Sequence, residues 1–98
     1  MALSVDTTPA KHVTVLRNGD NKYQGRKFII SRRRYRTFDS LLSDITHQIS
    51  APFGAVRRLY TPKGSRQIQG IDDLEGGATY VAGGTERFKK IEYVFSSF

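Results

Sequence analysis

One apolar stripe, bounded by residues that start and stop helices, does most to constrain how this chain can fold. The stripe consists of Phe38, Leu41, Leu42, Ile45 and Ile49. Residues at this spacing lie on one face of a helix, so the pattern predicts an amphipathic helix packed on a core. Thr37 suits the helix N-cap, and the helix dipole favours an acidic residue such as Asp39 in the first turn. Pro52 and Gly54 are expected to end the helix.

Short segments on both sides of this helix have the composition and alternation of β-strands. Strands are expected at residues 12–17, 26–31, 56–60, 67–69 and 79–82, and a further extended segment at 90–95. Asn18-Gly19 is a strong hairpin signal, but residues 20–25 lengthen the connection, which indicates a bulge or a widened loop. Residues 61–64 (TPKG) predict a turn, and residues 71–77 indicate one helical turn.

The length and the order of these elements predict one domain with a mixed architecture. A chain of 98 residues makes a single domain. The order strand, strand, helix, strand, strand, short turn, strand is typical of a ubiquitin-like β-grasp. This is an α+β fold, with a mixed sheet of four to five strands and one main helix packed on one face. We expect a disordered lead-in at residues 1–10, the domain at 11–95 and a tail at 96–98.

The segment before the helix is strongly basic. Residues 26–36 (RKFIISRRRYR) carry six basic residues and no acidic one, in a chain whose net charge is +7. Three consecutive arginines and Arg36 surround Tyr35. Because such a dense run repels itself, an acidic macromolecular partner explains it better than a merely solvated loop does.

Catalysis, metal binding and a membrane span find little support in the sequence. His12 and His47 are far apart and lack the spacing of metal ligands, and there is no cysteine. The carboxylates at residues 72, 73 and 75 precede a Gly-Gly turn, where a solvated capping role fits better than acid–base catalysis. No apolar run approaches the ~20 residues of a membrane span. We therefore expect a non-enzymatic intracellular domain with no cofactor, no metal and no membrane contact.

Four separated strings resemble the doublecortin domain family. They are VLRNGD (15–20), YRTFDSLLSDIT (35–46), GAVRRLYTPKG (54–64) and IDDLEGGATYVAGGTERFKKIEY (71–93). The resemblance covers nearly the whole chain from Lys11 to Tyr93. It implies a ubiquitin-like β-grasp, microtubule binding, no catalysis and a cytoplasmic, cytoskeletal location. Some relatives are ciliary, so an axonemal location is a finer expectation. Family proteins often carry two such domains, so the resemblance also implies that this domain is a piece of a longer chain.

The resemblance gives roles to individual positions. Asn18, Gly19 and Asp20 match the hairpin motif and are expected to be structural. The partner-binding candidates combine the loop-to-helix junction, the third-strand segment, the second turn and the C-terminal motif. They are Arg32, Arg33, Arg34, Arg36, Arg57, Arg58, Lys63, Arg66, Lys89 and Lys90. Of these, Arg36, Arg57, Lys89 and Lys90 match motifs of the family. The arginines at 32–34 are denser than expected of the family, and the sequence leaves open whether they strengthen the tubulin contact or serve another partner. The expected partner is tubulin in polymerised microtubules, bound by a monomeric domain that supports microtubule stabilisation or organisation.

Two other binding classes remain open at the level of the sequence. A ubiquitin-like adaptor in intracellular signalling would dock a signalling protein, a scaffold protein or a small GTPase by its sheet edge. Nucleic-acid binding would use the basic run with steep salt dependence, but the chain lacks a reading motif, so no nucleic acid is expected. The aromatic residues Phe38, Phe53, Tyr60, Tyr80 and Phe88 are expected in the core, not on a base-stacking platform.

Overall fold

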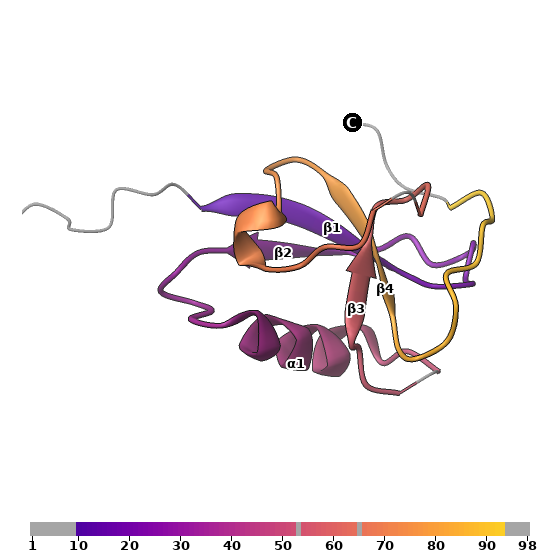
Figure 1. Ribbon diagram of the computed structural model, residues 1–98, viewed down its shortest axis with the longest axis horizontal. Helices are drawn as coiled ribbons and strands as arrows, with labels where there is room; N and C mark the ends of the chain where they lie inside the picture. The colour runs from indigo at the N-terminus through magenta and orange to yellow at the C-terminus, as the bar shows by residue number, and fades with distance from the viewer. Residues whose placement is uncertain (1–9, 53, 65, 94–98) are drawn as a thin grey trace, which may run out of the picture.

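A four-stranded mixed sheet with one long helix on one side forms the domain, as the computed structural model shows (Figure 1). The structure describes residues 10–52, 54–64 and 66–93. Its elements are β1 (Lys11–Arg17), β2 (Arg26–Ile30), α1 (Phe38–Ile49), β3 (Arg58–Tyr60), the single 3₁₀ turn η1 (Ile71–Asp73) and β4 (Thr79–Gly83). The predicted α+β, ubiquitin-like class is therefore confirmed. The expected tail and, apart from Ala10, the expected lead-in lie outside the described residues.

Strand β1 lies at the centre of the sheet because it pairs on both sides. The order of strands is β2-β1-β4-β3. β1 pairs antiparallel with β2, from Lys11 opposite Ile30 to Val15 opposite Arg26, and parallel with β4, with Val15 opposite Tyr80. β4 pairs antiparallel with β3. Parallel strands need a long crossover, and here the crossover from β1 to β4 contains the helix.

Helix α1 begins and ends where the sequence predicts, and its apolar stripe faces the sheet. The Thr37 hydroxyl accepts a hydrogen bond from the Ser40 amide at 3.1 Å, and the Ser40 hydroxyl accepts one from the Thr37 amide at 3.3 Å, which completes a capping box. Ser50 ends the helix in a left-handed conformation with φ 47°. Leu41, Leu42, Ile45 and Ile49 are buried, and Phe38 packs partly buried at the edge of the same core.

Several expected elements are shorter than the sequence indicated. The third strand covers only Arg58–Tyr60, and the segment 67–69 contributes a single bridge between Gln67 and Tyr60 instead of a strand. Residues 90–93 form no strand, and the remainder of the expected extended segment lies outside the described residues. The connection from β1 to β2 is the widened loop, with Gly19 at φ +82° inside it. The aromatic prediction holds for Tyr60 and Tyr80, which are buried, while Phe53 lies outside the described residues.

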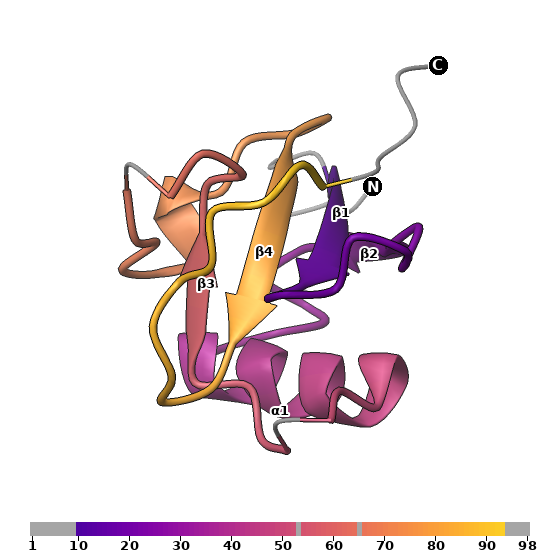
Figure 2. The ribbon, with the colours of Figure 1, turned by 90° about the vertical axis from the view of Figure 1, so that its right-hand side faces the viewer.

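The face of the sheet opposite α1 is covered by the chain's own C-terminal segment, residues 84–93, here called the strap. Leu16 and Val81 point to this face and pack with Tyr93 and the partly buried Phe88. The Phe88 ring lies 5.2 Å from that of Tyr60 and 6.0 Å from that of Tyr93, measured between centroids. Figure 2 shows the strap in yellow, running back beside β3 and β4.

Asn18 ties the strap to the end of β1. Its side chain is buried, and its amide nitrogen donates to the Glu86 carboxylate at 2.8 Å and to the Arg87 carbonyl at 2.9 Å. Its side-chain oxygen accepts from the Lys89 amide at 2.8 Å, and the Tyr93 hydroxyl lies 3.1 Å away. Burial raises the pKa of Glu86, but hydrogen bonds from Asn18 and from the backbone outweigh it, so the pKa lies below its ordinary value. Asn18 is therefore structural, as expected, through the strap and not through a tight hairpin.

Substitutions at two glycines with positive φ measure the cost of backbone strain separately from the cost of disturbing the packing of the strap. Gly64 (φ +74°) and Gly54 (φ +88°) adopt similar backbones, but an added Cβ would overlap the Phe88 ring at Gly64 and meet nothing at Gly54. Gly54→Ala should cost ~1–2 kcal/mol of unfolding free energy for the left-handed backbone alone. Gly64→Ala should cost a further ~1–3 kcal/mol because the ring must shift. Urea unfolding measures both, and equal losses would show that the strap does not press on the 61–64 turn.

Candidate functional site

A compact turn between β2 and α1 carries the arginine run, and residues 31–37 are here called the basic loop. The backbone amides of Arg34 and Tyr35 both donate to the Ser31 carbonyl, at 3.1 and 2.9 Å. Arg34 also donates from its amide to the Ser31 hydroxyl at 3.2 Å. At the other end the loop runs directly into the capping box at Thr37. The loop is therefore held by hydrogen bonds at its start and by the helix at its end.

Tyr35 anchors the basic loop in the core. Its side chain is 5% exposed, and it packs in the same cluster as the α1 stripe. Its hydroxyl donates a hydrogen bond to the carboxylate of Asp44 on α1. Burial and this hydrogen bond raise the pKa of Tyr35 above 10.0, against a smaller opposing effect of Arg34. Tyr35 lies inside the basic run of the sequence, and its burial is not among the sequence-based predictions, although an aromatic residue among arginines is a signal for such an anchor.

The arginines around this anchor face solvent. Arg32, Arg33, Arg34 and Arg36 are all exposed. Arg32 reaches Asp72 in η1 at 3.9 Å, where both side chains are largely exposed, so this pair stabilises the fold by only ~0–1 kcal/mol. A buried tyrosine thus holds four exposed cationic side chains on a short, ordered loop.

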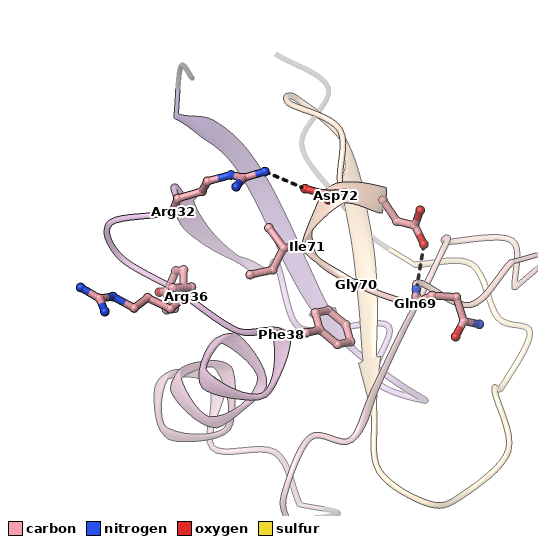
Figure 3. A pocket seen from close by; sticks show the side chains of 9 residues that line it. Arg32, Arg36, Phe38, Gln69, Gly70, Ile71 and Asp72 are labelled. Carbon is pink, nitrogen blue, oxygen red and sulfur yellow. Dashed lines mark hydrogen bonds and ion pairs between the residues drawn. The ribbon is translucent and has the colours of Figure 1, made fainter. Parts of the chain in front are cut away.

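An open groove lies between the basic loop and η1. Its volume is about 660 Å³, and its lining combines Arg32 and Arg36 with the apolar side chains of Phe38 and Ile71. Figure 3 shows the Arg32 guanidinium reaching toward Asp72, while the guanidinium of Arg36 points away from the groove. The groove is therefore cationic on the loop side, acidic on the η1 side and apolar between them.

The other predicted contact residues lie elsewhere on the domain. Arg57 precedes β3 beside α1, and Lys63 and Arg66 follow β3 in the next turn, so β3 separates the two groups (Figure 1). Arg66 pairs with Asp73 at 3.1 Å. Arg58 is half-buried, with its guanidinium 3.5 Å from the Tyr60 hydroxyl.

Lys89 and Lys90 belong to the strap and are exposed, and Lys89 lines a shallow hollow with Asn18 and Asp20. The structure thus brings together Arg32, Arg33, Arg34 and Arg36, but it does not gather all ten candidates into one patch.

Other basic residues either stabilise the fold or lie on a second surface. Arg17 donates to the Ile49 carbonyl at 3.1 Å at the end of α1, pairs with Asp20 at 2.9 Å and lies over the Tyr23 ring at 4.0 Å. By contrast, Arg26 and Lys27 of β2 are exposed, and they line a small groove together with Arg34. These two residues belong to the basic run of the sequence but are not among the predicted contacts.

The described residues offer neither a metal-binding cluster nor a helix that could span a membrane. They include no group of three or more histidine, cysteine, aspartate or glutamate side chains that could hold a metal ion. Among the same residues, no helix has the length and apolar character needed to cross a membrane.

Comparison with known proteins identifies the family. A family model described as Doublecortin matches residues 29–88, which include the basic loop, α1, β3 and β4. This chain belongs to the doublecortin family. It is 56% identical over 90 residues to mouse doublecortin domain-containing protein 2C, covering 92% of this chain and 26% of that protein. The family recognised from the four sequence strings is therefore confirmed.

More distant relatives share the same region of the chain. Rat doublecortin domain-containing protein 2 is 45% identical over 84 residues, which is 86% of this chain and 18% of the relative. Mouse serine/threonine-protein kinase DCLK1 is 43% identical over 88 residues, or 86% of this chain and 12% of the kinase. The chain thus spans about a quarter or less of the length of these relatives.

The Tyr35 anchor can be tested through the pH dependence of stability. Tyr35→Phe removes the hydrogen bond to Asp44 and should lower the unfolding free energy at neutral pH by ~0.5–1.5 kcal/mol. The raised pKa of Tyr35 means that the unfolded chain ionises first. The contribution of this tyrosine is therefore complete below its unfolded pKa and is lost as pH rises through the folded pKa.

The stability gap between wild type and Tyr35→Phe should consequently narrow above pH 10. Urea unfolding of both proteins between neutral and strongly alkaline pH measures the gap. A gap that stays constant or widens would contradict the buried, hydrogen-bonded phenol.

Proposed function

We propose that this domain binds microtubules and that the basic loop makes the main contact. The doublecortin family is known for microtubule binding, which supports the first part of the proposal. The second part rests on one observation, namely that four exposed arginines are held on a loop whose central residue, Tyr35, is buried. On this proposal the protein is associated with the cytoskeleton.

The chemistry of the loop suits an acidic polymer surface. Microtubule surfaces are strongly acidic, so a domain with a net charge of +7 is attracted and oriented before contact. Long arginine side chains lose entropy on binding, but an ordered backbone leaves less of the loop to be immobilised. Because exposed charges are screened by salt, binding should weaken as ionic strength rises.

The remaining basic groups offer a weaker case for the main contact. Arg66 already pairs with Asp73, and Arg58 is half-buried against Tyr60. Arg57, Lys63, Lys89 and Lys90 are exposed but distributed over three separate parts of the domain. They would add contacts only if the lattice wraps around the domain, so they are assigned a secondary role.

A single small module is expected to bind weakly. The relatives are several times longer than this chain, and a second binding module in the same protein would raise the effective concentration at the lattice. Stabilisation or organisation of microtubules is therefore proposed for the whole protein, with this domain as one of its contacts.

Charge reversal of the basic loop tests the proposed contact. The variant Arg32→Glu, Arg33→Glu, Arg34→Glu and Arg36→Glu replaces attraction by repulsion at four adjacent positions. Each exposed pair contributes ~0–1 kcal/mol, so the combined change should weaken co-sedimentation with polymerised microtubules by about tenfold or more. The fold should survive, because Tyr35 is unchanged.

The matched control reverses charge on the turn after β3. Lys63→Glu with Arg66→Glu should reduce binding much less, and both variants should keep their melting transitions. If the folded loop variant still pellets with microtubules at moderate salt, the basic loop is not the contact. Binding of unpolymerised tubulin or random duplex DNA at the same strength would instead favour non-specific charge attraction.

A further inference from the structure

Strand β2 forms one edge of the sheet, and its outward backbone groups can be identified. The Thr14 amide donates to Ala78 and the His12 carbonyl accepts from Gly77, so residues 12 and 14 of β1 direct their backbone groups toward β4. Their antiparallel partners in β2 are Ile29 and Lys27. In an antiparallel ladder such pairs exchange no hydrogen bonds with each other. The N–H and C=O groups of Lys27 and Ile29 therefore point away from β1, to the free edge.

This edge has no partner in the part of the chain that the structure describes. No described residue hydrogen-bonds to the outward groups of Lys27 and Ile29. The Ile29 side chain is 45% exposed, one of two large apolar side chains exposed among the described residues. An unpaired edge with an exposed β-branched residue is a template for another strand, and charges such as Lys27 keep like copies of the chain apart.

A small groove runs between this edge and α1, and the charged residues that line it favour an acidic ligand. Arg26, Lys27 and Arg34 are the basic residues that line it. The only carboxylate in the lining is that of Asp44, which accepts hydrogen bonds from the Tyr35 hydroxyl and, at 3.4 Å, from Gln48. The acceptor capacity of Asp44 is thus partly used within the fold, and the groove presents a net positive surface to an incoming chain.

We propose that β2 is a docking edge for an extended acidic peptide, which adds to the sheet as a strand beyond β2. The peptide backbone pairs with the outward groups of Lys27 and Ile29, as in other cases of strand addition. Side chains of an added strand alternate between the two faces of the sheet. The peptide then places a carboxylate beside Lys27 and an apolar side chain near Ile29 on one face of the sheet. Its side chains on the other face lie toward Arg34. This surface differs from the proposed microtubule contact, although Arg34 borders both.

The proposal can be tested with a short blocked peptide that alternates glutamate and valine, and with the 98-residue chain. Binding is measured by fluorescence anisotropy at low and moderate salt, and amide exchange of Lys27 and Ile29 is followed by NMR. We expect binding together with slowed exchange at both amides. A peptide of the same sequence with all internal amides N-methylated keeps its charge but loses its donors, so it should bind about tenfold more weakly or worse.

A pair of lysine variants separates the edge from general charge attraction. Lys27→Glu should weaken peptide binding by about fivefold or more, whereas Lys63→Glu, an equal change at another exposed lysine, should leave it nearly unchanged. Melting curves check that both variants are folded. Equal binding of the N-methylated peptide, equal effects of the two variants, or unchanged exchange at Lys27 and Ile29 would each overturn the docking edge. Loss of microtubule binding in the fourfold arginine-to-glutamate variant of the basic loop tests only the proposed microtubule contact and does not bear on the docking edge.

Discussion

Burial of the α1 stripe against β1, β2 and β4 is the contact on which the other features of the domain depend. Leu41 and Ile45 are at most 1% exposed, and they share a core with Val15 and Phe28 from the sheet. Burying such side chains contributes ~1.5–3 kcal/mol each, so the position of α1 on the sheet is strongly determined. The basic loop enters α1 directly, and Tyr35 joins the same core. The arginines are consequently displayed from a fixed position, although none of them is buried.

The second face of the sheet shows how a small domain covers apolar surface without a second helix. The strap places Phe88 and Tyr93 over Leu16 and Val81, and Asn18 hydrogen-bonds to four strap residues through its side chain. A buried amide would be costly if unpaired, but here both its nitrogen and its oxygen have partners. Because the strap, the turn at Gly64 and the end of β1 meet at these residues, this side of the domain behaves as one packed unit.

Local patterns in the sequence predict much of the fold and less of the site. The α1 stripe and the Thr37 cap predict the helix correctly because both signals are confined to neighbouring residues. Residues 67–69 form only a bridge at Gln67, since pairing depends on what lies opposite in space and not on local propensity. The roles of Asn18 and Tyr35 depend on partners 68 and 9 positions away, Glu86 and Asp44, which no local pattern identifies. For the same reason, the ten basic residues predicted together as contacts lie on several different surfaces of the fold.

The central claim is that the basic loop is the surface that meets the microtubule, and hydrogen–deuterium exchange of the domain with and without polymerised microtubules tests it most directly. The account predicts that exchange slows in peptides covering residues 31–37, while residues 61–64 and 87–91 change little. Slowing confined to the turn after β3 or to the strap, with residues 31–37 unchanged, would contradict the account and would assign the contact to Lys63, Arg66 or Lys89 and Lys90.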